Sequence, residues 1–212
     1  MDGTDLLAIA VSVFAIVNPI GTIPTFVALT GGYSRAEKRR VITKAVLVGG
    51  GVLLLFGLAG QAIFSVFSIT IPAFRIAGGI LIFKVAFDML QGERPKSDST
   101  DAEITDALER DSIGITPLGV PLLAGPGAIT TVMILVANHG DALDRGVIYA
   151  VVLAVFLVSF LLLLAGERLF RLLGRSGLAV FSRIMGLILA AIAVQFVVNG
   201  LLQALPGLAR LS

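Results

Sequence analysis

Residues 18–24 read Asn18-Pro19-Ile20-Gly21-Thr22-Ile23-Pro24 and interrupt an apolar stretch, residues 6–33, that contains no charged side chain. Proline has no backbone N–H to donate, and glycine has no Cβ to restrict its backbone, so this composition breaks a helix. A break inside a membrane must be buried in protein or line a wet cavity, because lipid cannot satisfy the freed backbone groups. The segment therefore predicts a special site within a membrane span.

A second interruption follows in the other half of the chain, where residues 125–131 read Gly125-Pro126-Gly127-Ala128-Ile129-Thr130-Thr131. Broken spans at corresponding places in two halves are the best sequence indicator of a transporter's binding site. For either segment alone, a kink used only for packing is the simpler interpretation. The matched pair, with its glycines and polar neighbours, favours a binding site.

The composition requires a membrane environment. Hydrophobic residues make up 57% of the chain and charged residues 14%, with a mean hydropathy of +0.99, whereas soluble domains carry about 25% charged residues. Three uncharged runs, residues 6–33, 45–74 and 146–166, exceed the ~18 residues that indicate a spanning helix. No basic patch alternates with aromatic residues, so nucleic acid is not an expected partner. The chain has no cysteine, which excludes disulfides and Cys-ligated metals.

Six spans are predicted, at residues 6–30, 46–67, 73–90, 115–137, 147–165 and 178–202. Twelve Lys and Arg residues fall on one side of them, and three fall on the other, namely Arg75, Arg145 and Arg210. Because the cytoplasmic side carries the excess of basic residues, both termini are expected on the extracytoplasmic side of the cell inner membrane. Residues 92–114 are then a cytoplasmic acidic linker.

The two halves of the chain repeat one another. The segment beginning Arg75-Ile76-Ala77-Gly78-Gly79 recurs as Arg183-Ile184-Met185-Gly186-Leu187, and the offset between these segments is nearly the offset between Pro19 and Pro126. Three spans per half is an odd number, so the halves enter the membrane from opposite sides, which is typical of secondary transporters. The predicted fold is an all-α membrane protein of six transmembrane helices in two inverted three-helix repeats. The repeats are residues 1–91 and 115–212, with the first and fourth helices broken at mid-membrane.

Taken together, these motifs resemble the MarC family of integral membrane proteins over nearly the whole chain. The resemblance is carried by residues 18–24, 75–79, 117–129, 183–186 and 195–200. It implies a six-span inner-membrane protein, and some members of that family carry glycine and alanine, driven by the proton gradient. The expected function is therefore secondary transport of small neutral amino acids, coupled to protons.

The predicted substrate site lies between the broken first and fourth spans. The start of a half-helix offers N–H groups and positive dipole character to a carboxylate, and the end of the other half offers C=O groups to an ammonium. Such a site needs no charged side chain, metal or cofactor. The candidate substrate-binding residues are Asn18, Pro19, Gly21, Thr22, Pro24, Gly125, Pro126, Gly127, Thr130, Thr131, Gln195 and Asn199.

Two polar pairs have more than one interpretation. Lys84 and Asp88 share a helix face because they are four residues apart, and they are either a proton-coupling pair or a pair solvated near the cytoplasmic interface. The second interpretation is favoured, because the other repeat has Ile192 and Phe196 at these places. For Gln195 and Asn199, hydrogen bonding between helices and lining of the site are equally supported.

Other functional classes find little support in the sequence. It has no His-Glu-x-x-His, Gly-x-Ser-x-Gly or phosphate-binding loop motif, so it is not expected to be an enzyme. The alternatives are an exporter or channel for another small metabolite, or a structural membrane protein without transport activity. A channel favours a continuous polar stripe or a charged ring, and a structural protein needs no matched breaks. The sequence indicates no particular oligomeric state.

Overall fold

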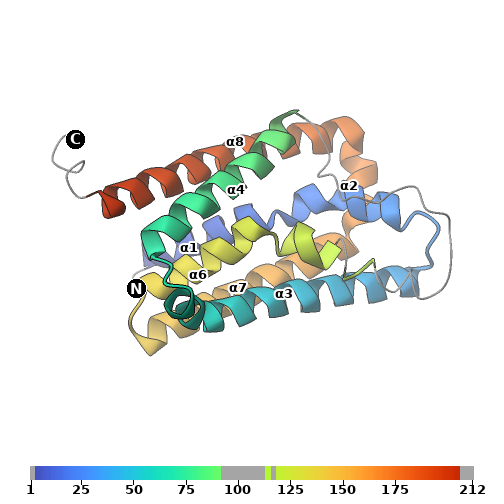
Figure 1. Cartoon of the computed structure of the whole chain (residues 1–212). Helices are drawn as coiled ribbons and strands as arrows, with labels where there is room; N and C mark the ends of the chain where they lie inside the picture. Colours follow the sequence, from blue (N-terminus) through green and yellow to red (C-terminus); the bar gives the residue numbers. More distant parts are fainter. Residues whose placement is uncertain (1–2, 92–112, 116–117, 206–212) are drawn as a thin grey trace.

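The computed structural model describes residues 3–91, 113–115 and 118–205, and the regular elements in this part of the chain are all helical. The all-α prediction is confirmed for these residues. Figure 1 shows an elongated bundle in which the first helix begins and the last helix ends at the same end of the molecule. The elements are α1 (Gly3–Val17), α2 (Pro19–Leu29), α3 (Arg35–Val66), α4 (Ile71–Gln91), the π-helical η1 (Leu118–Leu123), α6 (Pro126–Asn138), α7 (Ala142–Leu164) and α8 (Gly166–Ala204).

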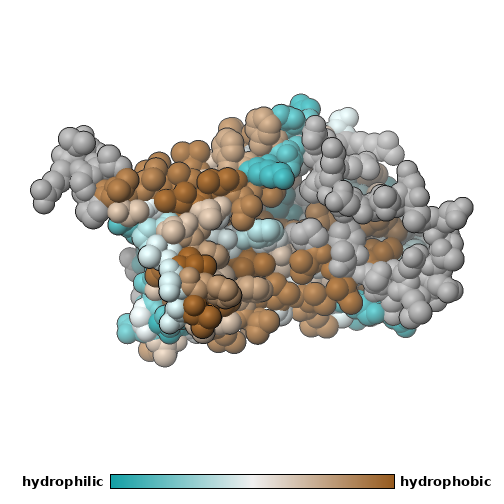
Figure 2. Space-filling view, in the orientation of Figure 1, coloured by the Kyte–Doolittle hydropathy of each residue, from teal (hydrophilic) through white to brown (hydrophobic). Residues whose placement is uncertain are grey.

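Four helical segments are long and apolar enough to cross a membrane, namely Gly3–Leu29, Arg35–Val66, Ala142–Leu164 and Ser176–Ala204. Two of the predicted spans do not reach that standard. Helix α6 has only 13 residues, and α4 carries Arg75, Lys84 and Asp88 among its 21 residues. Apart from the grey residues, apolar side chains cover most of the face seen in Figure 2, as a lipid-facing surface requires.

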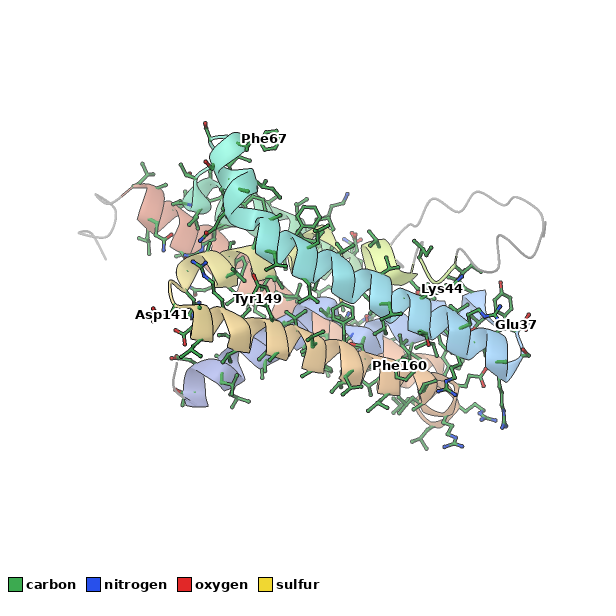
Figure 3. The ribbon with its side chains drawn as sticks, turned by 90° about the horizontal axis from the view of Figure 1, so that it is seen from below. Glu37, Lys44, Phe67, Asp141, Tyr149 and Phe160 are labelled. Carbon is green, nitrogen blue, oxygen red and sulfur yellow. The ribbon has the colours of Figure 1, made fainter. Side chains whose placement is uncertain are left out.

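Two helices begin earlier than the sequence predicts. Helix α3 starts at Arg35 because Ser34 and Glu37 form a capping box, so the basic residues that follow are helical and not in a loop. Helix α8 likewise starts at Gly166, and Gly174, with a positive φ of 64°, bends it before the apolar part. Figure 3 shows the resulting length of α3, with Glu37 and Lys44 toward one end and Phe67 at the other.

The helix α1 ends and α2 begins at Asn18, whose backbone is left-handed with φ 48° and ψ 56°. Asparagine tolerates this conformation better than most residues, because its short amide can hydrogen-bond locally. Pro19 then occupies the first helical position, where a missing N–H costs little. The second half also starts a helix at a proline, but there Gly125 is extended and Pro126 begins α6 without a side-chain cap.

Contacts between the helices recur at the sequence offset that separates Pro19 from Pro126. A Cβ built on Gly79 of α4 would lie 2.7 Å from the carbonyl oxygen of Ala193 in α8. A Cβ on Gly186 of α8 would lie 3.0 Å from the carbonyl oxygen of Ala86 in α4. Gly186 follows Gly79, and Ala193 follows Ala86, by that same offset. The two helices therefore run antiparallel in close contact, and the same contact is made twice with the partners exchanged.

The same exchange relates the other helix pairs. Gly49 of α3 packs against Phe156 of α7, with a built Cβ 2.9 Å from Phe156 Cε1, and the repeat offset also separates these two residues. Helix α4 packs on α6 as α8 packs on α2, and α3 packs on η1 as α7 packs on α1. The halves therefore contact each other reciprocally, with α2 corresponding to α6, α3 to α7, and α4 to the apolar part of α8.

Candidate functional site

A cavity of about 460 Å³ lies beside the interruption at Asn18, between α2, α4 and α8. Its polar lining comes from Asn18, Thr22, Thr25 and Ser182. Among the described residues that line it, none carries a charge. The remaining wall is apolar and includes Ile16, Val85, Met89, Leu122, Phe170 and Leu189. The volume falls within the range of ~300–1,000 Å³ for small-molecule sites, so the cavity suits a small, uncharged or zwitterionic ligand.

Asn18 is held firmly in this wall. Its Oδ1 accepts the N–H of Gly21 at 3.2 Å, and its Nδ2 lies 3.5 Å from the Sδ of Met89 on α4. Thr22 donates its hydroxyl to the carbonyl oxygen of Asn18 at 3.2 Å. A Cβ on Gly21 would collide with the Asn18 amide, so only glycine leaves room for this cap. The left-handed backbone and the cap together fix the amide at the cavity wall.

These bonds change how a ligand can be bound at the first interruption. The sequence predicts free N–H groups at the start of the second half-helix, but Asn18 already takes the N–H of Gly21, and the N–H of Thr22 bonds to the Asn18 carbonyl at 3.3 Å. The hydroxyls of Thr25 and Ser182, in contrast, have no hydrogen-bond partner within the described residues. The groups offered to a ligand here are therefore mainly side chains.

The first predicted motif lies along the cavity, whereas the second does not. Asn18, Gly21, Thr22 and Pro24 line it, and Pro19 is buried beside them. The residues of the second motif are absent from the lining.

The second motif is packed instead. A Cβ on Gly127 would lie 2.6 Å from Ile82 Cγ1 of α4, and the methyl group of Thr130 fills the space above Gly78. Thr130 and Thr131 are buried, and each donates its hydroxyl to a carbonyl four residues earlier, at 2.8 Å. Gly125 caps α6 without any side-chain hydrogen bond, next to Pro126. Direct helix contacts therefore fill the region between α4 and the start of α6.

The remaining predicted polar residues lie away from the cavity. Gln195 donates to Asn199 at 2.8 Å along α8, and Gln195 is exposed. Lys84 is exposed and Asp88 is half-buried, and the two form no ion pair with each other. Within the described residues, no group of His, Asp and Glu side chains could hold a metal ion.

Sequence reasoning missed two polar members of the cavity wall, Thr25 and Ser182. Thr25 could have been found, because it follows Asn18 and Thr22 at seven and three residues and so shares their helix face. Ser182 offers no such signal, since only the packing of α8 against α2 brings it to the cavity.

An ion pair lies at the end of the bundle at which α3 and α8 begin. Lys38 donates to Glu167, linking the first turns of these two helices. The hydrogen bond from Lys38, more than any other influence, holds the pKa of Glu167 below its usual range. The first turns of these helices also carry Arg35, Arg39, Arg40, Arg168 and Arg171, which makes this the basic end of the molecule. It lies opposite the end at which α1 begins (Figure 1).

Comparison with known proteins places the chain in a family. A family model described as MarC family integral membrane protein matches residues 4–205. A UPF0056 membrane protein of Methanocaldococcus jannaschii is 45% identical over 191 residues, covering 90% of this chain and 84% of that protein. The UPF0056 membrane proteins YvbG of Bacillus subtilis and YhcE of Escherichia coli are 36% and 35% identical, covering 95% and 93% of this chain and 96% and 92% of theirs. No solved structure matches. The chain therefore belongs to the MarC family of integral membrane proteins.

Proposed function

We propose that this protein is a secondary transporter, and not an enzyme, for small neutral amino acids of the glycine and alanine class. The observation that carries the proposal is the cavity of about 460 Å³ beside the Asn18 interruption, lined by neutral polar groups. Interrupted helices are where many secondary transporters bind substrate. The substrate binds in this cavity.

The lining matches the chemistry of a small zwitterion. The amide of Asn18 and the hydroxyls of Thr25 and Ser182 supply neutral donors and acceptors for a carboxylate and an ammonium group. The N-terminus of α2 adds positive dipole character on the carboxylate side. Apolar residues such as Val85 and Met89 leave no charged contact for a longer polar side chain, which favours glycine and alanine.

The reciprocal helix contacts support two inverted repeats, and α4 and the broken α2 and α6 then count as parts of six spans. The proposed location of these spans is the cell inner membrane. An inverted repeat places its substrate site at the interface of the halves. The cavity is bounded by α2 and α4 of the first half and by α8 of the second, as this arrangement requires. With the basic end in the cytoplasm, both termini are extracytoplasmic.

Proton coupling is part of the proposal, and it does not depend on Lys84 and Asp88. Lys84 is exposed on α4, and neither residue lines the cavity. The double variant Lys84→Leu with Asp88→Leu removes both charges together, which avoids leaving one charge alone in the bilayer. Uptake of labelled alanine by this variant is expected to respond to an imposed pH gradient as the wild type does. A variant that binds alanine but loses the response would identify the pair as the coupling site.

The experiment that tests the function uses purified protein in liposomes and a panel of labelled amino acids, with and without a pH gradient. Saturable uptake of alanine and glycine, stimulated by the gradient, is expected. Asn18→Ala is expected to lose most of this uptake, whereas Asn138→Ala, at an exposed asparagine outside the cavity, keeps it. Flux without saturation would favour a channel, and absence of flux for the whole panel would favour a structural protein.

A further inference from the structure

Arg75 is a buried cation with no counter-charge among the described residues. It lies on α4 and is only 7% exposed, at one end of a buried stripe that continues through Gly78, Gly79, Ile82 and Ala86. Within the described residues it has no ion pair and no hydrogen bond. Every side-chain nitrogen or oxygen of the described residues that is fully buried has a hydrogen-bond partner. The guanidinium nitrogens of Arg75 therefore keep some accessible surface, which a small ligand could reach.

Such an arrangement is costly for a membrane protein. Removing a charge from water without pairing it is strongly unfavourable. Ionisable residues within membrane helices therefore usually pair with each other or mark the path of a substrate. Arginine is also the side chain best suited to a carboxylate, because its planar fork donates two parallel hydrogen bonds. A bound carboxylate would supply the counter-charge that none of the described residues supplies.

The position of Arg75 relates it to the cavity. Arg75 lies one turn before Gly78 and Gly79, which contact Thr130 of α6 and Ala193 of α8, so it sits on the face of α4 that meets these two helices. The reciprocal contacts align the two repeats one residue closer than the motif comparison does, so the counterpart of Arg75 in the other repeat is Ser182 and not Arg183. Ser182 lines the cavity. Arg75 thus has, in the packed region between α4, α6 and α8 (the closed half), the place that Ser182 has at the cavity between α2, α4 and α8 (the open half).

A second feature of the closed half also favours an anion. The N-terminus of α6 has no side-chain cap, because Gly125 stands where Asn18 caps α2. The positive end of the α6 dipole is therefore not compensated by a side-chain oxygen. The open half has a capped helix and a serine, whereas the closed half has an uncapped helix and an arginine.

We propose that Arg75 binds the carboxylate of the substrate when the half between α4, α6 and α8 opens. The carboxylate is recognised by charge and geometry, and the cavity beside Asn18 receives the same molecule when the opposite half is open. The identity of the carboxylate as that of an amino acid rests on the proposed function. The role of the guanidinium does not, because any small carboxylate tests it.

The test measures ligand-dependent thermal stabilisation and equilibrium binding of purified protein with alanine, alaninamide and propionate. Alaninamide lacks the carboxylate, and propionate lacks the ammonium. Arg75→Gln is expected to weaken binding of alanine and propionate by at least about tenfold, the effect of losing a charge-assisted hydrogen bond. Arg75→Lys, which keeps the charge and loses the fork, should lie between Arg75→Gln and the wild type. The control Arg183→Gln removes the exposed arginine at the matching motif position and should bind like the wild type.

Each outcome decides the role of Arg75. An unchanged response of Arg75→Gln to alanine and propionate overturns it, as does a wild type that binds alanine and alaninamide equally or binds neither carboxylate. A collapse of unliganded stability in both Arg75 variants would assign the residue a structural role and also overturn it. If propionate binds through Arg75 and no amino acid binds, the proposed function fails and the carboxylate site stands.

Discussion

The half of the molecule around Asn18 and the half around Gly125 are built on the same plan, yet one holds a cavity and the other is closed. Each has a helix that starts at a proline after an interruption and packs mainly against helices of the other repeat. The difference lies in a few side chains at equivalent positions. Asn18 stands where the other half has Gly125, and Thr25 where it has Val132. Polar groups line the open half, and helix contacts fill the closed one.

Small residues decide how closely the helices approach one another. Gly78 allows Thr130 to lie directly on α4, and Gly127 allows Ile82 to lie directly on α6. At the repeat offset their counterparts are Met185 and Ile20, which are larger. Opening the closed half would separate Thr130 from Gly78, and closing the open half would fill the cavity.

The reciprocal contact between α4 and α8 should be the most sensitive. Gly79→Val places a Cβ 2.7 Å from a backbone oxygen, and Gly186→Val places one 3.0 Å from the equivalent oxygen. Overpacking costs about 1–3 kcal/mol, more where backbone must move. Both variants should lose several degrees of melting temperature, Gly79→Val the more. Gly51→Val, where nothing lies within 4 Å, is the control. If one glycine tolerates valine fully, the two contacts are not equivalent.

Asn18 is one of the residues by which the open half differs from the closed half. Two substitutions distinguish the contribution of its side chain from that of its backbone conformation. Asn18→Gly keeps the left-handed conformation and should cost only a few tenths of a kcal/mol, whereas Asn18→Ala adds about 1–2 kcal/mol for that conformation. Alanine uptake should fall about tenfold or more in both, because both lose the amide at the cavity wall. Uptake that falls only in Asn18→Ala would mean that the backbone, and not the amide, is what matters.

Gly21 is expected to act through Asn18. In Gly21→Ala the new methyl group displaces the Asn18 amide, so uptake should fall to nearly the level of Asn18→Gly. The double variant should then be no worse than the single ones, since coupled neighbours are not additive. Fully additive losses would show that Gly21 contributes independently of the cap. Liposome uptake of alanine, normalised to the amount of folded protein, measures both.

The smallest effect is expected at the basic end, where Glu167 bonds to Lys38. Because its folded pKa is lowered, Glu167 stabilises the protein above its unfolded pKa, and this contribution is lost as pH falls through the folded pKa. The pair is partly exposed, so Glu167→Gln should cost less than about 1 kcal/mol at neutral pH. The difference in melting temperature from the wild type should vanish in acid. A difference that grows toward low pH would contradict this assignment.

The sequence indicates the interruptions well, because proline, glycine and asparagine act locally. Helices α2 and α6 begin at Pro19 and Pro126 for the reason that the motifs suggest. The sequence does not indicate which face of α6 packs against α4. A threonine hydroxyl can donate to a carbonyl of its own helix on any face of that helix. Only the contact of Thr130 with Gly78 fixes the face of α6 that meets α4.

Arg75 shows the same limit. Sequence reasoning counts it among the charges that flank the spans, whereas α4 begins at Ile71 and packing buries the arginine. The residues 92–112, most of the predicted linker, lie outside the described part of the chain.

Substrate protection of a thiol in the cavity wall shows directly whether the cavity beside Asn18 binds a small neutral amino acid. The chain has no cysteine, so a Thr25→Cys variant carries a single thiol in the cavity wall. The rate at which a small thiol reagent labels this variant is measured in the purified, transport-active protein with increasing alanine. We predict that alanine slows labelling saturably, whereas labelling of a Gly146→Cys variant, where nothing lies within 4 Å, is unaffected. Labelling of Thr25→Cys that does not change at saturating alanine or glycine would contradict the account.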